Sequence, residues 1–171
     1  MKISKKYLAL AVAASFFAAG GAYAATQSVD IDMSFDTALT LTNPTPIDFG
    51  ILQALTSGTY TVDTTGALST GGGGVAIGGS PNAGVVHITG STTQTVAIST
   101  GSYVADGNVT PSAATCLYNS VLTTDCDTGV TGALAPGAGQ DLTLGVTISA
   151  DGSQTAGSTP APSFTVTVIY G

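Results

Sequence analysis

Few residues of this chain could carry out acid–base or nucleophilic chemistry. Among its 171 residues are ten acidic groups, all of them Asp, and a single His, His87. Histidine titrates near neutral pH, so a hydrolase would have to use His87 as its general base with a Ser and an Asp as partners. His87 lies in the strand-like run Val85–Thr89, however, and no G-x-S-x-G motif occurs. We therefore expect no enzymatic activity, and an enzyme acting through His87 is kept as an alternative.

Two further segments could hold a ligand. Several Asp share one face of an extended segment or flank Cys126, and carboxylate oxygens are the ligands that Ca²⁺ prefers. The EF-hand spacing is absent, so a solvated acidic face is the preferred interpretation and a Ca²⁺ site the alternative. The run Gly71–Gly74 lacks the Lys of a phosphate-binding loop. We expect neither a cofactor nor a metal. The acidic candidates are Asp30, Asp32, Asp36, Asp125 and Asp127.

The distribution of charge excludes several classes of partner. The three basic residues are Lys2, Lys5 and Lys6, and no Lys or Arg follows them. Phosphate contacts need cationic side chains, so nucleic-acid binding is excluded, and nucleotide cofactors and anionic membrane surfaces are disfavoured. Stability must then come from apolar burial, backbone hydrogen bonds and any disulfide.

The N-terminus predicts export. Residues 1–24 combine three lysines, the apolar run Tyr7–Ala19 and the small residues of Ala22–Ala24, as a cleaved signal peptide does. The apolar run is shorter than the roughly 20 residues that a membrane-spanning helix needs. We expect residues 25–171 to form a single domain located in the periplasm, at the cell surface or outside the cell, with no membrane span after cleavage.

Export also bears on the two cysteines. Cys116 and Cys126 form an even pair in a chain expected to be exported, which predicts a disulfide between them. Two sulfurs with no His nearby are a poor zinc site, and the spacing differs from the C-x-x-C of redox centres. The disulfide is therefore interpreted as structural.

Alternating apolar residues mark both ends of the chain. Period-two alternation places one type of side chain on each face of a strand. The N-terminal alternation continues through Leu39 and Leu41, which is long for one strand. It could form two collinear strands, one strand bent near Asp36, or an arm that extends beyond its own domain. We name the four residues at each end the N-terminal row (Val29, Ile31, Met33, Phe35) and the C-terminal row (Phe164, Val166, Val168, Tyr170).

The middle of the chain also favours short strands over helices. No segment shows a sustained apolar period of 3.6 residues, and several strand-forming runs are separated by Gly, Pro, Asn and Ser. Residues 85–89 and 94–99 are predicted to form a hairpin, and residues 101–139 to be irregular. This pattern predicts an all-β fold, specifically an immunoglobulin-like Greek-key β-sandwich. The predicted strands are residues 29–42, 47–52, 59–62, 75–77, 85–89, 94–99, 141–149 and 164–170.

Particular motifs resemble two groups of exported bacterial proteins. The ending Phe164–Gly171 resembles the closing strand of chaperone–usher pilins, which alternates apolar residues up to a penultimate Tyr. The ordered motifs Pro46–Gly50, Gly84–Gly90, Leu142–Ser149 and Phe164–Tyr170 resemble the family called domain of unknown function 4402. That family has no assigned activity, and its likeness to spore-coat-U-like and pilin domains implies an immunoglobulin-like sandwich and extracellular assembly.

Together these observations favour a structural subunit of a bacterial surface filament or coat. The N-terminal row has the form of a donor strand that adds to a sheet edge of another subunit, and the C-terminal row is the candidate assembly strand. The expected partner is a second copy or a related subunit, and the resemblance to pilins adds a periplasmic assembly chaperone. The alternative is a self-contained secreted β-sandwich that binds glycan or Ca²⁺.

Overall fold

The computed structural model describes residues 27–171, so the predicted signal peptide lies outside the described residues. Between residues 27 and 171 no α-helix occurs, and hence none that could cross a membrane. The strands are β1 (Thr40–Thr45), β2 (Ile51–Leu52), β3 (Ser57–Val62), β4 (Leu68–Gly71), β5 (Ala76–Gly78), β6 (Gly84–Thr89), β7 (Val96–Val104), β8 (Val109–Tyr118), β9 (Val121–Thr123), β10 (Val130–Ala133), β11 (Gln140–Asp151) and β12 (Ser163–Tyr170).

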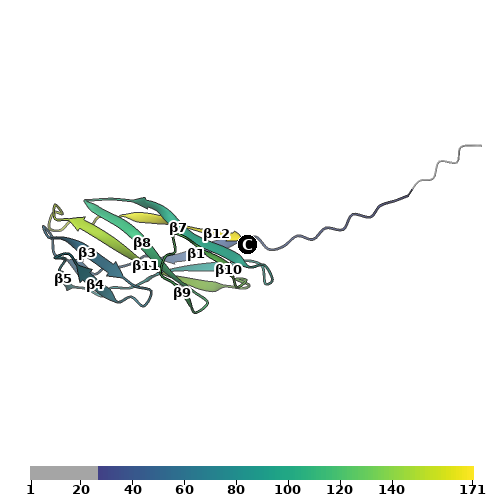
Figure 1. Cartoon of the computed structure of the whole chain (residues 1–171), viewed down its shortest axis with the longest axis horizontal. Coiled ribbons are helices and arrows are strands. Elements are labelled where there is room, and N and C mark those ends of the chain that lie inside the picture. Colours follow the sequence, from purple (N-terminus) through teal and green to yellow (C-terminus); the bar gives the residue numbers. More distant parts are fainter. Residues whose placement is uncertain (1–26) are drawn as a thin grey trace, which may run out of the picture. The chain divides into compact units, whose positions relative to one another are not determined.

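The strands form two main antiparallel sheets. The larger sheet has seven strands and contains the path β1-β6-β11-β3-β4, with β8 pairing β11 and β9 (Figure 1). The smaller sheet has the order β10-β7-β12, and β2 and β5 form a separate pair. Buried side chains from both main sheets belong to one core cluster, so the fold is an all-β sandwich, as predicted.

Strand β11 organises the larger sheet. Its first half pairs with β6 and its second half with β3, while β8 pairs along its other side. Gly145 lies between the residues of β11 that pair with β6 and those that pair with β3. A Cβ at this position would lie 2.6 Å from the backbone oxygen of Val62 and 2.5 Å from Oγ1 of Thr115. Only glycine allows the backbones to approach so closely at this junction.

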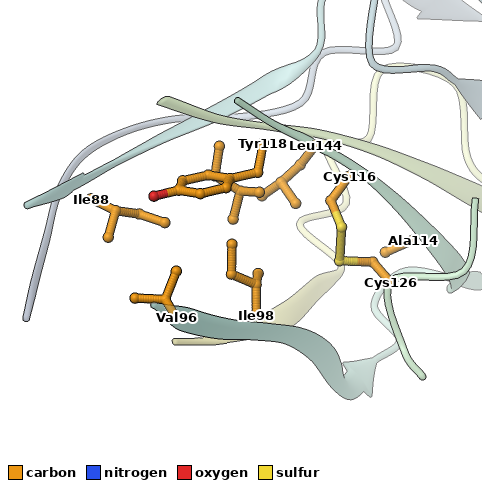
Figure 2. Packing of buried hydrophobic residues seen from close by; sticks show 9 residues of the cluster. Ile88, Val96, Ile98, Ala114, Cys116, Tyr118, Cys126 and Leu144 are labelled. Carbon is orange, nitrogen blue, oxygen red and sulfur yellow. A yellow bond between two sulfur atoms is a disulfide. The ribbon is translucent and has the colours of Figure 1, made fainter. Parts of the chain in front are cut away.

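The core lies between the two sheets. Val96 and Ile98 of β7 face Ile88, Tyr118 and Leu144 of the larger sheet (Figure 2). Each of these side chains is at most 4% exposed. The alternation seen in the sequence is therefore the alternation of core-facing and outward-facing residues.

Two predictions from the middle of the chain were wrong. β6 and β7 do not form a hairpin, because β6 belongs to the larger sheet and β7 to the smaller one. The connection crosses between the sheets, where Gly90 donates its backbone N–H to the Gly137 carbonyl oxygen. Residues 101–139 are also not irregular, since they contain all ten residues of β8. Small residues such as Ala113 and Ala114 weaken the alternation there, but neighbouring strands provide the hydrogen bonds.

The strand predicted from Val29 starts later than expected. Residues 27–39 contain no strand, and β1 begins at Thr40 and continues through Pro44 to Thr45 with a register shift. The chain divides into two units at Asp36, with Val29–Phe35 in the first. Residues 29–39 therefore form neither the two collinear strands nor the single bent strand that the sequence left open.

Candidate interaction surface

The most regular open sheet edge belongs to β12. It pairs with β7 from Thr165 to Tyr170 without a register shift, and in the described part of the chain no strand pairs with its other side. Its core-facing residues, the C-terminal row, are only half-buried, whereas the equivalent row of β11 is fully buried. The core is therefore less completely covered along β12 than at the centre of the larger sheet.

Other edge strands in residues 27–171 are short or irregular. β4, β9 and β10 have four, three and four residues. β1 contains Pro44, which cannot donate a hydrogen bond, and both β1 and β10 have register shifts. Short, bulged or proline-containing edges resist pairing with another chain. β12 has eight residues, with no proline and no charge, and its one register shift lies at its start, between Ser163 and Thr165.

The N-terminal row is exposed. The side chains of Val29, Ile31, Met33 and Phe35 are 81, 81, 70 and 91% exposed, and residues 27–35 contain no strand. Exposed apolar side chains gathered in this way are typical of interaction segments.

A buried serine fixes the point where the second unit begins. Ser91 is 1% exposed, its Oγ donates to Oδ2 of Asp36 at 2.6 Å, and its backbone N–H donates to the Tyr170 hydroxyl at 2.7 Å. The Tyr170 hydroxyl donates in turn to the Thr37 carbonyl oxygen. These four residues, the Ser91 cluster, hold Asp36 and Thr37 beside the last residues of β12. Sequence analysis missed Ser91, because nothing distinguishes it from the many other Ser and Thr residues.

His87 lies in a pair with an aspartate. His87 and Asp141 are directly opposite on β6 and β11, with His87 Nδ1 and Asp141 Oδ1 2.7 Å apart. Nε2 of His87 lies against Gly139, where a Cβ would be 2.1 Å away. β8, with the turn residue Ser120 after it, lies on the other side of β11 from β6. The structure thus brings His87 and Asp141 together, and both line one surface pocket with Ser120, whose hydroxyl makes no hydrogen bond with His87 within the described residues.

The aspartates of the folded unit accept hydrogen bonds, mostly from backbone N–H and hydroxyl groups. Within residues 27–171 no group of three or more His, Cys, Asp or Glu residues has an arrangement that could hold a metal ion. Asp125 accepts from the backbone N–H groups of Asp127 and Thr128, which shapes the loop around Cys126. All eight aspartates from Asp36 onward accept at least one hydrogen bond, namely Asp36, Asp48, Asp63, Asp106, Asp125, Asp127, Asp141 and Asp151.

The predicted disulfide between Cys116 and Cys126 is confirmed. Both residues are at most 1% exposed, and Cys126 attaches its loop to both sheets. Its backbone N–H donates to Ala114 of β8, and its carbonyl oxygen accepts from Thr100 of β7. Asp127 accepts from the Thr100 and Tyr103 hydroxyls at 2.5 Å each. Burial, with this bond to Asp127, raises the pKa of Tyr103 above its usual value.

These carboxylates predict a loss of stability in acid. The Thr65 hydroxyl and the backbone N–H groups of Ala67 and Thr65 lower the pKa of Asp63, and the Ser91 hydroxyl and Thr37 N–H lower that of Asp36. A carboxyl whose pKa is lowered in the folded state stabilises it above the unfolded value of about 3.9, and that contribution disappears as pH falls through the folded pKa.

We expect the urea midpoint to be nearly constant between pH 7 and about pH 5 and to fall below about pH 4. Asp63→Asn should reduce the size of this fall, because Asn does not titrate. Asp32→Asn is the matched control, since Asp32 lies outside the folded unit. A midpoint as high at pH 3 as at pH 7 would contradict this expectation.

The fold is a β-sandwich with one disulfide, and within the described residues no strand pairs with the outer side of β12. The family described as domain of unknown function (DUF4402) matches residues 39–170, most of the chain, and the chain therefore belongs to that family, as the motifs suggested. No curated protein and no solved structure matches the chain.

Proposed function

We propose that this chain is an exported structural subunit of a bacterial surface filament or coat, assembled by β-strand complementation. The N-terminal row of one copy would add to the open edge of β12 in another copy, and its side chains would cover the half-buried C-terminal row. A related subunit could either donate the row or offer the open edge that accepts it. An assembly chaperone in the periplasm would protect the same edge before assembly.

The observation that carries the proposal is the match between the exposed row and the open edge. Both have four apolar residues at every second position, the edge has no proline or charge, and its pairing with β7 runs from Thr165 to Tyr170 without a register shift. The segment carrying the row begins before the region matched to the family and is not needed to build either main sheet.

The energetics explain why the row needs a sheet edge. Burying four large apolar side chains contributes about 6–12 kcal/mol in total. Fixing the backbone of seven residues costs about 7–14 kcal/mol. Joining two molecules costs about 4–15 kcal/mol more in lost translational and rotational freedom, so apolar burial alone would not hold the row. The hydrogen bonds of a newly paired strand, about 0.5–1.5 kcal/mol each, are needed as well. An apolar surface without an open edge would not hold the row.

Deletion of Val29–Phe35 tests the proposal. We expect the truncated protein to be exported and folded but monomeric by gel filtration, with no polymers in negative-stain electron micrographs. A synthetic peptide of residues 27–36 should bind the truncated protein and raise its melting temperature.

A peptide carrying Ile31→Asp and Met33→Asp is the matched control. It should not raise the melting temperature, because charged side chains cannot cover the core. Polymers formed normally by the truncated protein would contradict the proposal. So would a native chain that is folded and stays monomeric at high concentration.

A further inference from the structure

We propose that the N-terminal row pairs antiparallel with β12 of a second copy, with Val29 opposite Tyr170 and Phe35 opposite Phe164. This inference rests on the proposed function, because it specifies how the two strands meet. It also decides whether the assembly is an open filament or a closed dimer.

The register follows from the lengths of the two rows. Each row has four apolar side chains spaced by two residues, so one antiparallel register opposes all four pairs. A shift of two residues would leave Phe35 beyond Ser163 or Val29 beyond Tyr170, with no apolar partner. Losing the burial of a whole apolar side chain outweighs any gain from an exposed cross-strand pair. In the full register Ser34 lies opposite Thr165 on the outer face, and both are exposed.

The orientation follows from the Ser91 cluster. Its hydrogen bonds hold Asp36 and Thr37 beside Tyr170, at the C-terminal end of β12. An N-terminal segment of the same copy could therefore reach its own β12 only by running from the Ser163 end towards the Tyr170 end, which is parallel. A segment from a second copy has no such restriction. Antiparallel pairing has the better hydrogen-bond geometry, and it is available only between copies.

The orientation also determines the geometry of the assembly. In the antiparallel arrangement the donor's Asp36 arrives at the Ser163 end of the acceptor, while the acceptor's own Asp36 lies at its Tyr170 end. The contacts are then head to tail, and each acceptor donates in turn at its opposite end. Such a heterologous contact propagates as an open filament. In a parallel arrangement the Tyr170 ends of both copies meet, and two copies can exchange segments and close as a dimer.

Disulfide trapping distinguishes the two arrangements. The pair Ser34→Cys and Thr165→Cys is directly opposed only in the antiparallel register. The matched pair Asp30→Cys and Thr165→Cys is opposed only in the parallel one. All three positions are exposed, so the substitutions leave the core intact, and the native cysteines remain paired within each chain.

Under mild oxidation we expect the first pair to give a ladder of cross-linked multimers on a non-reducing gel, with at least ten times the yield of the second pair. A mixture of the two single variants Ser34→Cys and Thr165→Cys should give a cross-linked dimer, which shows that the contact joins two molecules. Preferential cross-linking of the second pair, with closed dimers in electron micrographs, would overturn the orientation but leave strand exchange in place. Folded monomers without cross-links for either pair would overturn both proposals.

Discussion

Replacing Cys116 and Cys126 together by alanine is expected to lower the free energy of unfolding by about 3 kcal/mol or more. The two residues are ten positions apart, and their bond restricts the unfolded chain. In the folded chain both side chains lie in the core beside Ala114 (Figure 2). The loop of Cys126 also donates to β8 and accepts from β7, so loosening it weakens a connection between the two sheets.

Urea unfolding of the native chain and the double variant measures this effect. Removing both sulfurs leaves no free thiol that could form bonds between molecules. Thr128→Ala is the matched control, because Thr128 is exposed in the same loop and its hydroxyl makes only a local hydrogen bond to Asp125. That control should change stability by at most about 0.5 kcal/mol. A double variant as stable as the native chain would show that the loop keeps its position without the disulfide.

The fold could be predicted from the sequence wherever the alternation was strong. β11 and β12 were predicted within two residues, because Leu142, Leu144 and the C-terminal row alternate with Thr and Ser. β8 was missed, since the small residues Ala113 and Ala114 carry little alternation. β6 and β7 were predicted to pair with each other because they are close in sequence. Their inward side chains instead face each other across the core, which local sequence does not reveal.

The candidate interaction surface, like the fold, could be predicted from the sequence only in part. Both terminal rows could be found from the sequence, because each consists of large apolar residues at every second position. The open edge of β12 could not be found, because an edge is defined by which strand is missing beside it. Ser91 could not be found either, because its importance comes from contacts with residues 55 and 79 positions away.

The distribution of aspartates distinguishes the folded unit from the N-terminal segment. Seven of the eight aspartates from Asp36 onward accept hydrogen bonds from backbone N–H, hydroxyl or amide groups, and Asp141 of β11 pairs with His87. Within residues 27–171 no hydrogen bond involves Asp30 or Asp32, and these two residues alternate with the N-terminal row. On a paired strand they would face outward and stay in water while the apolar row turns inward. Asp36, Asp125 and Asp127 are exposed like Asp30 and Asp32, so all five acidic candidates lie at the surface.

Ser91→Ala is expected to lower the free energy of unfolding by about 2 kcal/mol. Its hydroxyl donates to Asp36 and accepts from the backbone N–H groups of Thr93 and Gln94 at 3.1 and 3.0 Å. Alanine would fill the same buried position without these bonds, and polar groups left without partners carry a desolvation cost. The variant should also speed amide hydrogen exchange at Thr37, because Asp36 would no longer be tied to Ser91.

Thr92→Ala is the matched control, since the neighbouring Thr92 is exposed and its side chain makes none of these hydrogen bonds. It should change stability by at most about 0.5 kcal/mol and leave exchange at Thr37 as it is. Tyr170→Phe tests the same cluster from the other side, because it removes the hydroxyl that accepts from Ser91 and donates to Thr37. If Ser91→Ala proves as stable as Thr92→Ala, the Ser91 cluster does not fix Asp36. The N-terminal segment would then be free to approach β12 from either end.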